Sequence, residues 1–293
     1  MIIYKFGYFL NILVDGEDME DYEIKRVVKD RYGRMAREAG SCCSSSCCGT
    51  AEPKEIGKKI GYSKDDLASA PQGANLGLGC GNPIAIASIR EGETVLDLGS
   101  GAGFDCFLAS ERVGPAGKVI GVDMTGEMVA RAVANATRGG YKNVEFRLGE
   151  IESLPVEDGS VDLIVSNCVI NLVPDKKAAF KEAYRVLRPG GRMIVSDIVL
   201  QGILPKFIRE SVEAYVGCVS GAAEKEEYLA SMRSAGFEDV RVMEEAAFFL
   251  DCVNCGPADR KILDGPEISE EELKGVEKAI VSMTVRAVKP VTA

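Results

Sequence analysis

The chain has 293 residues, of which 46% are hydrophobic, enough to bury the core of one large domain or of two smaller ones. Its net charge of −10 argues against a nucleic-acid partner and against an anionic membrane surface, because both require a basic face. The sequence has no histidine, which excludes imidazole as a general base, as a metal ligand and as a member of a catalytic triad.

The N-terminal part reads as a helix between two segments without clear periodicity. Residues 1–14 form an apolar run that is too short to span a bilayer and lacks the basic start of a signal peptide, so we expect residues 1–18 to lie outside the fold. An amphipathic helix is expected over residues 19–39, a short element over 56–61, and a helix over 65–70 with Ser63 as its N-cap. Between the first two, a mobile loop of small residues contains Cys42, Cys43, Cys47 and Cys48.

From residue 93 onward, apolar strands alternate with helices. Strands are expected at 95–98, 118–123, 144–148, 161–166 and 192–197, and helices at 104–113, 126–139 and 176–187. Nearly continuous apolar strands separated by helices are typical of a doubly wound, mostly parallel α/β sheet. Beyond the turn expected at 189–191, residues 207–235 should be helical and 240–249 a pair of strands. We therefore predict an N-terminal segment at 19–73, a core domain at 74–200 and a smaller C-terminal α+β region at 201–293.

A glycine-rich loop follows the first of these strands. Residues 99–103 read Gly-Ser-Gly-Ala-Gly, and small residues before a helix let the backbone and its free N–H groups approach a ligand. The third glycine comes one residue too early for the dinucleotide pattern G-x-G-x-x-G. Asp97 precedes the loop, and Asp123 ends the next strand, where a carboxylate can bind a ribose diol. A plain tight turn is the alternative, and these features together disfavour it.

This combination resembles the cofactor motifs of the class I S-adenosylmethionine-dependent methyltransferases over about residues 74–240. Residues 149–155 resemble the segment that lies along the adenine, and residues 187–191 resemble a later turn of that family. The resemblance implies a Rossmann-like fold with seven strands, of which the last is antiparallel. It also implies that S-adenosylmethionine is bound by Asp97, Gly99, Ser100, Gly101, Gly103, Asp123, Met124, Glu150, Ile151 and Asn167.

Three cysteines are placed near this predicted cofactor site. Cys168 follows the strand 161–166, so its thiol should lie at the carboxyl edge of the sheet, where ligands bind in such folds. Cys80 lies on a glycine-rich loop, and Cys218 lies in the stretch expected to be helical. A single buried cysteine is usually an inert small hydrophobe, an alternative that these positions disfavour. Thiolates select soft, thiophilic atoms.

The three contexts resemble those of the arsenite S-adenosylmethionine methyltransferases, which implies that Cys80, Cys168 and Cys218 are As(III) ligands. That family often has a further N-terminal cysteine, and distance from Cys80 favours Cys47 or Cys48 here. The resemblance implies an enzyme that methylates thiol complexes of arsenite and methylarsenite. Ten cysteines in a chain without a secretion signal indicate reduced thiols in the cytoplasm, and we expect a monomer. Electrons lost by arsenic would be returned by a thiol reductant, either glutathione or thioredoxin.

The remaining cysteines leave alternatives open. Cys106 is expected to be core packing in the helix 104–113. Cys252 and Cys255 form one C-x-x-C pair, which is half of a zinc site, a redox or arsenic-delivery pair, or a pair without a specific role. Two other functions also stay open. A methyltransferase of a small metabolite, such as a quinone precursor, gives the cysteines no role, and a non-catalytic metalloid-binding protein leaves the cofactor motifs without one.

Overall fold

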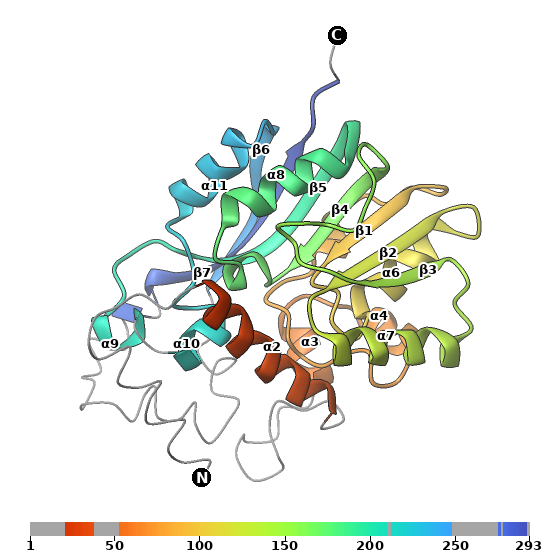
Figure 1. Ribbon diagram of the computed structural model, residues 1–293, viewed down its shortest axis with the longest axis horizontal. Coiled ribbons are helices and arrows are strands. Elements are labelled where there is room, and N and C mark those ends of the chain that lie inside the picture. The colour runs from red at the N-terminus through yellow and green to blue at the C-terminus, as the bar shows by residue number, and fades with distance from the viewer. Residues whose placement is uncertain (1–20, 38–52, 210–211, 248–274, 277, 292–293) are drawn as a thin grey trace.

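The computed structural model describes residues 21–37, 53–209, 212–247, 275–276 and 278–291. Seven strands form one sheet in the order β3-β2-β1-β4-β5-β7-β6 (Figure 1). β7 runs antiparallel to both of its neighbours, whereas the pairs from β3 to β5 are parallel. The expected Rossmann-like methyltransferase sheet is therefore confirmed. The strands are β1 Thr94–Leu98, β2 Lys118–Asp123, β3 Val144–Leu148, β4 Val161–Asn167, β5 Leu187–Leu200, β6 Glu238–Ala247 and β7 Ile280–Val288.

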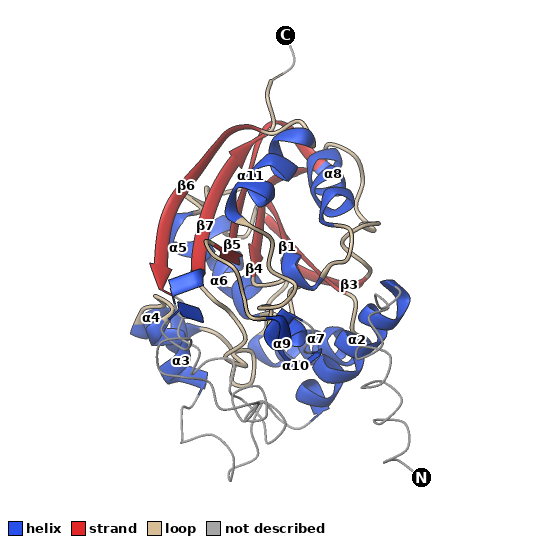
Figure 2. Ribbon diagram, turned by 90° about the vertical axis from the view of Figure 1, so that its left-hand side faces the viewer, coloured by secondary structure: helices blue, strands red, loops and turns tan. Residues whose placement is uncertain are grey.

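Helices cover both faces of the sheet (Figure 2). α6 packs on β1 and β2, while α8 and α11 pack together on the other side, against β5 and β6. The described helices are α2 Asp21–Arg37, α3 Pro53–Lys59, α4 Lys64–Ser69, α5 Pro83–Ile86, α6 Phe104–Val113, α7 Gly126–Gly139, α8 Lys176–Val186, α9 Lys206–Arg209, α10 Val212–Val216 and α11 Lys225–Ser234, with a 3₁₀ turn at Ile170–Leu172.

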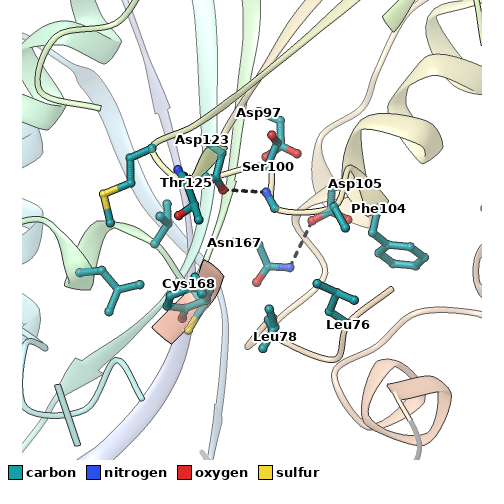
Figure 3. A pocket seen from close by; sticks show the side chains of 18 of the residues that line it. Leu76, Leu78, Asp97, Ser100, Phe104, Asp105, Asp123, Thr125, Asn167 and Cys168 are labelled. Atoms are coloured by element: carbon teal, nitrogen blue, oxygen red, sulfur yellow. Dashed lines mark hydrogen bonds between the residues drawn. The ribbon is translucent and has the colours of Figure 1, made fainter. Parts of the chain in front are cut away.

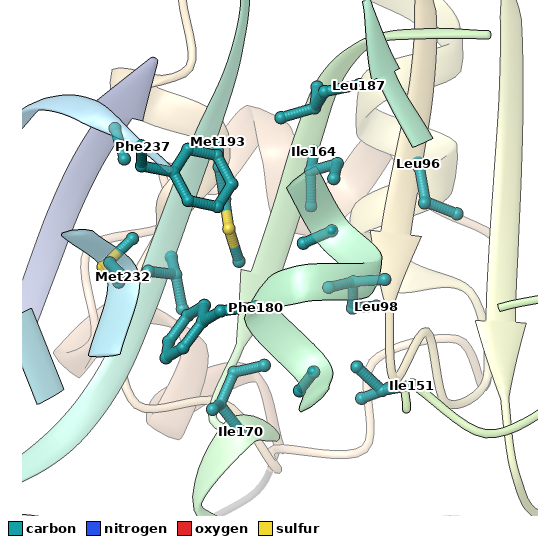
Figure 4. Close-up of a cluster of buried hydrophobic side chains, with 14 of the residues drawn as sticks. Leu96, Leu98, Ile151, Ile164, Ile170, Phe180, Leu187, Met193, Met232 and Phe237 are labelled. Carbon is teal, nitrogen blue, oxygen red and sulfur yellow. The ribbon is translucent and has the colours of Figure 1, made fainter. Parts of the chain in front are cut away.

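Successive side chains of a strand point to opposite faces of the sheet, and both faces are buried at the central strand β1, which is therefore largely apolar. Leu96 and Leu98 of β1 point into the core under α8 and α11, where Phe180 lies (Figure 4). Val95, which precedes Leu96 in the strand, points to the opposite face and packs with α6. Since both faces are covered, neither can be polar, and the sheet positions the loops at its carboxyl edge rigidly.

The elements expected between residues 93 and 200 are confirmed within a few residues, with one correction. Residues 189–191, expected to be a turn, lie within the long strand β5, although Gly190 keeps a left-handed φ of 79°. The pairing of β4 with β5 shifts register between Val161 and Leu163, which lets the strand continue through this irregularity. At α4, the expected Ser63 cap is confirmed as a reciprocal capping box with Asp66.

Two expectations for the C-terminal third were wrong. Residues 207–235 are not helical throughout: α10 ends at Val216 and α11 begins at Lys225, and Cys218 lies in a turn between them with a φ of 64°. Residues 240–247 are not a pair of strands: they belong to β6 alone, which pairs with β7, more than thirty residues further along the chain. Residues 248–249 lie outside the described residues. The division at residues 74 and 200 stays a prediction, although β6 and β7 complete the same sheet.

Candidate cofactor and thiol site

A pocket opens at the carboxyl ends of β1, β2 and β4 and encloses about 1140 Å³, counting the part open to solvent (Figure 3). Of the predicted cofactor residues, it is lined by Asp97, Gly99, Ser100, Gly101, Asp123, Met124, Ile151 and Asn167. Gly103 and Glu150 are not among the lining residues. Gly103 packs against Phe107 and Phe146, and Glu150 pairs with two lysines of α2.

Asp123 is held with its carboxylate oriented by the backbone. Its two oxygens accept hydrogen bonds from the N–H of Gly101 at 2.9 Å and of Thr125 at 2.8 Å. Burial raises the pKa of Asp123, and these N–H donors counteract part of the rise. The neighbouring Ser100 hydroxyl is buried without a hydrogen-bond partner among the described residues. This end of the pocket therefore has acceptors and a donor that fit the ribose hydroxyls of a nucleoside.

The glycines of the loop are required by geometry at two positions. Gly99 has a φ of 67°, and a Cβ there would lie 2.4 Å from the Val169 side chain. Gly103 has a φ of 92°, and its Cβ would lie 2.7 Å from Phe146. A side chain at either position would cause both backbone strain and a steric clash. The loop can therefore adopt this conformation only with glycine at residues 99 and 103.

A second polar group lies opposite Asp123 and was not anticipated in full. Tyr62 donates a 2.6 Å hydrogen bond to Asp105, and the amide of Asn167 donates to the same carboxylate at 3.3 Å. Burial raises the pKa of Asp105 to about 6. Burial and then the charge of Asp105 raise the pKa of Asp97 well above its ordinary value. A polar side chain on the otherwise apolar start of α6 is the signal that could have identified Asp105.

The raised pKa of Asp105 leads to a prediction about stability. Because the folded state holds this proton up to about pH 6 and the unfolded state releases it near 3.8, the free energy of unfolding should fall as pH rises between these values. The expected contribution is on the order of 3 kcal/mol. Urea unfolding of the wild type and of Asp105→Asn from pH 4 to pH 6 measures it. Parallel pH curves for the two proteins would contradict the assignment.

The three predicted cysteines lie together in the interior. The sulfur atoms of Cys80 and Cys168 and a carboxylate oxygen of Asp197 all lie within 4.8 Å of one another. The neighbouring thiols of Cys218 and Cys80, together with burial, raise the pKa of the Cys168 thiol well above its usual value. The Cys218 thiol also approaches the Cys168 carbonyl oxygen at 3.2 Å. We call Cys80, Cys168 and Cys218 the thiol group; Cys168 is its member that also lines the cofactor pocket.

Two members of the thiol group have unusual backbone conformations. Cys168 has a φ of 58° and Cys218 a φ of 64°, both in the left-handed region that residues with a Cβ rarely adopt. Such conformations typically cost about 1–3 kcal/mol and gather at functional sites. Cys168 directly follows β4, and Cys218 follows α10, so both strained residues are at the ends of regular elements.

Asn167 connects the cofactor pocket to Cys80. Its amide oxygen accepts the Cys80 N–H at 3.0 Å, and its amide nitrogen donates to the Gly81 carbonyl at 2.9 Å. From the last strand, Ser282 donates to the Cys80 carbonyl at 2.7 Å. A Cβ on Gly79 would lie 2.7 Å from Asn167, so the glycine-rich surroundings of Cys80 reflect close packing. The same side chain thus fixes Cys80 and faces the pocket.

Helix α2 closes the pocket, which the sequence did not indicate. Lys25, Val28 and Tyr32 line the pocket, and Lys25 forms ion pairs with Glu150 and Glu152. Burial raises the pKa of Tyr32 well above its ordinary value, and the charges of Cys218, Cys168 and Asp123 raise it further. The Tyr32 hydroxyl donates to the Val216 carbonyl at 3.4 Å, which places it beside the end of α10, two residues before Cys218.

The remaining predicted cysteines divide into two sets. Cys106 is buried in the core as expected, and its thiol donates to the Asp97 carboxylate at 3.2 Å. Six others lie outside the described residues: Cys42, Cys43, Cys47, Cys48, Cys252 and Cys255. Within the described ranges, no helix combines the length and the apolar character needed to cross a membrane.

Comparisons with known proteins agree with this geometry. A family model described as a methyltransferase domain matches residues 89–236. The arsenite methyltransferase of Halobacterium salinarum is 47% identical over 234 residues, which cover 77% of this chain and 60% of that protein. The human arsenite methyltransferase is 35% identical over 230 residues, covering 75% and 59%. The chain thus spans about 60% of the length of these relatives.

A solved structure shows the same likeness. CrArsM, an arsenic(III) S-adenosylmethionine methyltransferase from Chlamydomonas reinhardtii, is 34% identical, with a TM-score of 0.59. The match covers 80% of this chain and 74% of that one. Sequence, sheet topology and the likeness to these proteins together show that the chain belongs to the methyltransferase domain family and, within it, to the arsenite S-adenosylmethionine methyltransferases.

Proposed function

We propose that this protein transfers a methyl group from S-adenosylmethionine to trivalent arsenic held by Cys80, Cys168 and Cys218. The observation that carries the proposal is the buried thiol group, which meets the cofactor pocket at Cys168. Three thiols around one small volume suit a soft atom with three ligands. The strained backbone at Cys168 and Cys218 supports a functional reason for their placement.

The cofactor pocket has groups that fit S-adenosylmethionine. Asp123 would accept hydrogen bonds from the ribose, with Ser100 and the Gly101 backbone beside it, and Ile151 would contact the adenine. When bound, the cofactor supplies an electrophilic methyl group on a sulfonium. Tyr32 and Cys168 face the region between the two ligands and would restrict water there. Holding two reactants in line can lower a barrier by about 7–11 kcal/mol.

The chemistry needs no general base, in keeping with the absence of histidine. Arsenite exchanges its three hydroxyl groups for three thiols, and three water molecules are released. Arsenic keeps its lone pair, which attacks the methyl carbon. An arsenic–carbon bond forms, and the carbon–sulfonium bond breaks with its electrons going to sulfur. Arsenic is thereby oxidised by two electrons, and glutathione or thioredoxin would return the product to the trivalent state.

We also propose that the protein acts in a reducing compartment. The cysteines within the described residues, Cys80, Cys106, Cys168 and Cys218, are all free thiols. Unpaired thiols are typical of the cytoplasm, which we propose as the compartment. Thioredoxin as a partner, the monomeric state and a role for Cys47 or Cys48 stay predictions.

One assay separates the proposed function from its alternatives. The protein is incubated with S-adenosylmethionine labelled in the methyl group, glutathione and arsenite, and a second reaction also contains a quinone precursor. The labelled products are separated by chromatography and identified by mass spectrometry. Labelled methylarsenic is the expected result. Arsenite binding without labelled product would indicate a metalloid-binding protein. Labelling of a quinone precursor, with arsenic untouched, would indicate a small-metabolite methyltransferase.

Cys80→Ser should affect the two arsenic substrates differently. Arsenite offers three exchangeable ligands, whereas methylarsenite offers two, which Cys168 and Cys218 can satisfy. The variant should therefore lose methylation of arsenite and retain that of methylarsenite, as measured by product speciation with each substrate. Equal loss on both would mean that Cys80 serves every step or supports the loop that Asn167 holds.

A further inference from the structure

Asp197 is a buried carboxyl group that the proposed methyl transfer does not use. One of its oxygens lies within 4.8 Å of the sulfur atoms of Cys80 and Cys168, and its side chain is inaccessible to solvent. It follows Ser196 in β5, whose carbonyl faces the Cys80 thiol at 3.4 Å. Trivalent arsenic with three sulfur ligands is neutral and has no requirement for a fourth donor, so arsenic chemistry alone does not explain this carboxyl group.

The surroundings of Asp197 orient it and balance charge. Asn171 and the Ile198 N–H donate to one carboxylate oxygen at 2.9 and 3.0 Å, and Tyr228 donates to the other at 3.2 Å. The half-buried ammonium group of Lys176 interacts electrostatically with both Asp197 and Cys218. Hydrogen bonds of this kind, from groups that do not themselves touch the metal, fix the orientation of carboxylates that act as metal ligands. The carboxyl group is therefore ordered, partly balanced by a cation, and turned toward the thiols.

We propose that the thiol group and Asp197 together form a four-ligand site for a soft divalent cation of the Zn²⁺ or Cd²⁺ type. The ligands are Cys80, Cys168, Cys218 and Asp197. A tetrahedral zinc site with sulfur ligands at about 2.3 Å places its donors roughly 3.8 Å apart. The donors of Cys80, Cys168 and Asp197 already lie within 4.8 Å of one another, so small side-chain shifts bring them together. The Cys218 thiol, which approaches the Cys168 carbonyl oxygen at 3.2 Å, would turn from that oxygen to complete the set.

Charge explains why a divalent cation would use Asp197 and trivalent arsenic would not. Three thiolates neutralise trivalent arsenic completely. A divalent cation favours a fourth donor, and Lys176 offsets part of the negative charge that results. The cation and arsenite share three ligands, so each should exclude the other. The proposal rests on the same cysteines as the proposed function, but not on methyl transfer.

The test uses the full chain in a background that removes competing thiols. The six cysteines outside the described residues are changed to serine: Cys42, Cys43, Cys47, Cys48, Cys252 and Cys255. Cd²⁺ is then titrated and followed by the ultraviolet sulfur-to-cadmium charge-transfer band, and arsenite binding is measured by equilibrium dialysis. The variants are Asp197→Asn, which preserves size, Cys168→Ser, and the exposed-carboxylate control Glu226→Gln on α11.

We expect one Cd²⁺ per chain, displaced by arsenite. Asp197→Asn should weaken Cd²⁺ binding about tenfold to a hundredfold, and change arsenite affinity little. Cys168→Ser should bind neither Cd²⁺ nor arsenite, and Glu226→Gln should bind both as the wild type does. No Cd²⁺ binding, unchanged Cd²⁺ affinity in Asp197→Asn, or retained binding in Cys168→Ser would each overturn the proposal. Cd²⁺ binding as expected, with no methylated arsenic in the assay above, would overturn the proposed function alone.

Discussion

Cys168→Ser is expected to abolish methylation of arsenite while the fold is retained. Serine matches the size of cysteine but offers a hard, protonated oxygen where a soft thiolate is needed. The loss should be complete, because Cys168 lies beside both other thiols and also lines the cofactor pocket. Product speciation measures the activity, and circular dichroism measures the fold.

Two further cysteine variants make this result specific. Cys218→Ser should behave in the same way, since its thiol completes the group on the other side of Cys168. Cys106→Ser is the matched control: this cysteine is equally buried, and a serine hydroxyl can still donate to Asp97. Near wild-type turnover in Cys168→Ser would rule out arsenic held by three thiolates. Loss of activity in Cys106→Ser as well would point to general damage to the fold.

Asp123→Ala should weaken the binding of S-adenosylmethionine and leave arsenite binding nearly unchanged. A hydrogen bond to a charged group is worth about 1.5–3 kcal/mol, so affinity should fall roughly tenfold to a hundredfold. The substitution also removes the acceptor that orients Gly101 and Thr125, which adds to the loss. Calorimetry with each ligand separately provides the measurement.

An isosteric variant distinguishes charge from loop geometry. Asp123→Asn keeps one oxygen acceptor for the backbone and loses the negative charge. Its affinity for S-adenosylmethionine should therefore lie between those of the wild type and Asp123→Ala. Asp65→Ala, an exposed carboxylate at the start of α4, should bind both ligands normally. Unchanged cofactor affinity in Asp123→Ala would remove this residue from the binding site.

Much of the sheet could be predicted because burial on both faces leaves a strong local pattern. β1, β2 and β3 and the helices between them follow the apolar runs within one residue. The glycine loop was equally readable, since its glycines and the flanking Asp97 and Asp123 are fixed by local geometry. Cys168 was placed correctly because its position depends only on where β4 ends.

The features that escaped prediction depend on contacts between distant parts of the chain. Nothing local shows that Cys218 leaves the helical pattern, since its left-handed turn is held by packing against Cys168. The apolar sequence of β7 indicates a buried strand, but it does not show that β7 inserts between β5 and β6, so that the order in the sheet differs from the order in the chain. Asp197 reads as an ordinary strand residue until Asn171 and Tyr228 are brought beside it.

The hydrogen bond from Ser282 to the Cys80 carbonyl has a consequence for the order of assembly. It joins residues separated by 202 positions, and Ser282 belongs to the strand that enters the sheet last in the chain. During synthesis, the cofactor half from β1 to β4 is complete long before β7 emerges, whereas the Cys80 loop acquires this restraint only when β7 docks between β5 and β6. Non-local pairing of this kind is slow to form. The Cys80 loop, which Asn167 already holds, therefore receives its last restraint only from the final strand of the sheet, and the thiol group reaches its finished geometry at the end of assembly.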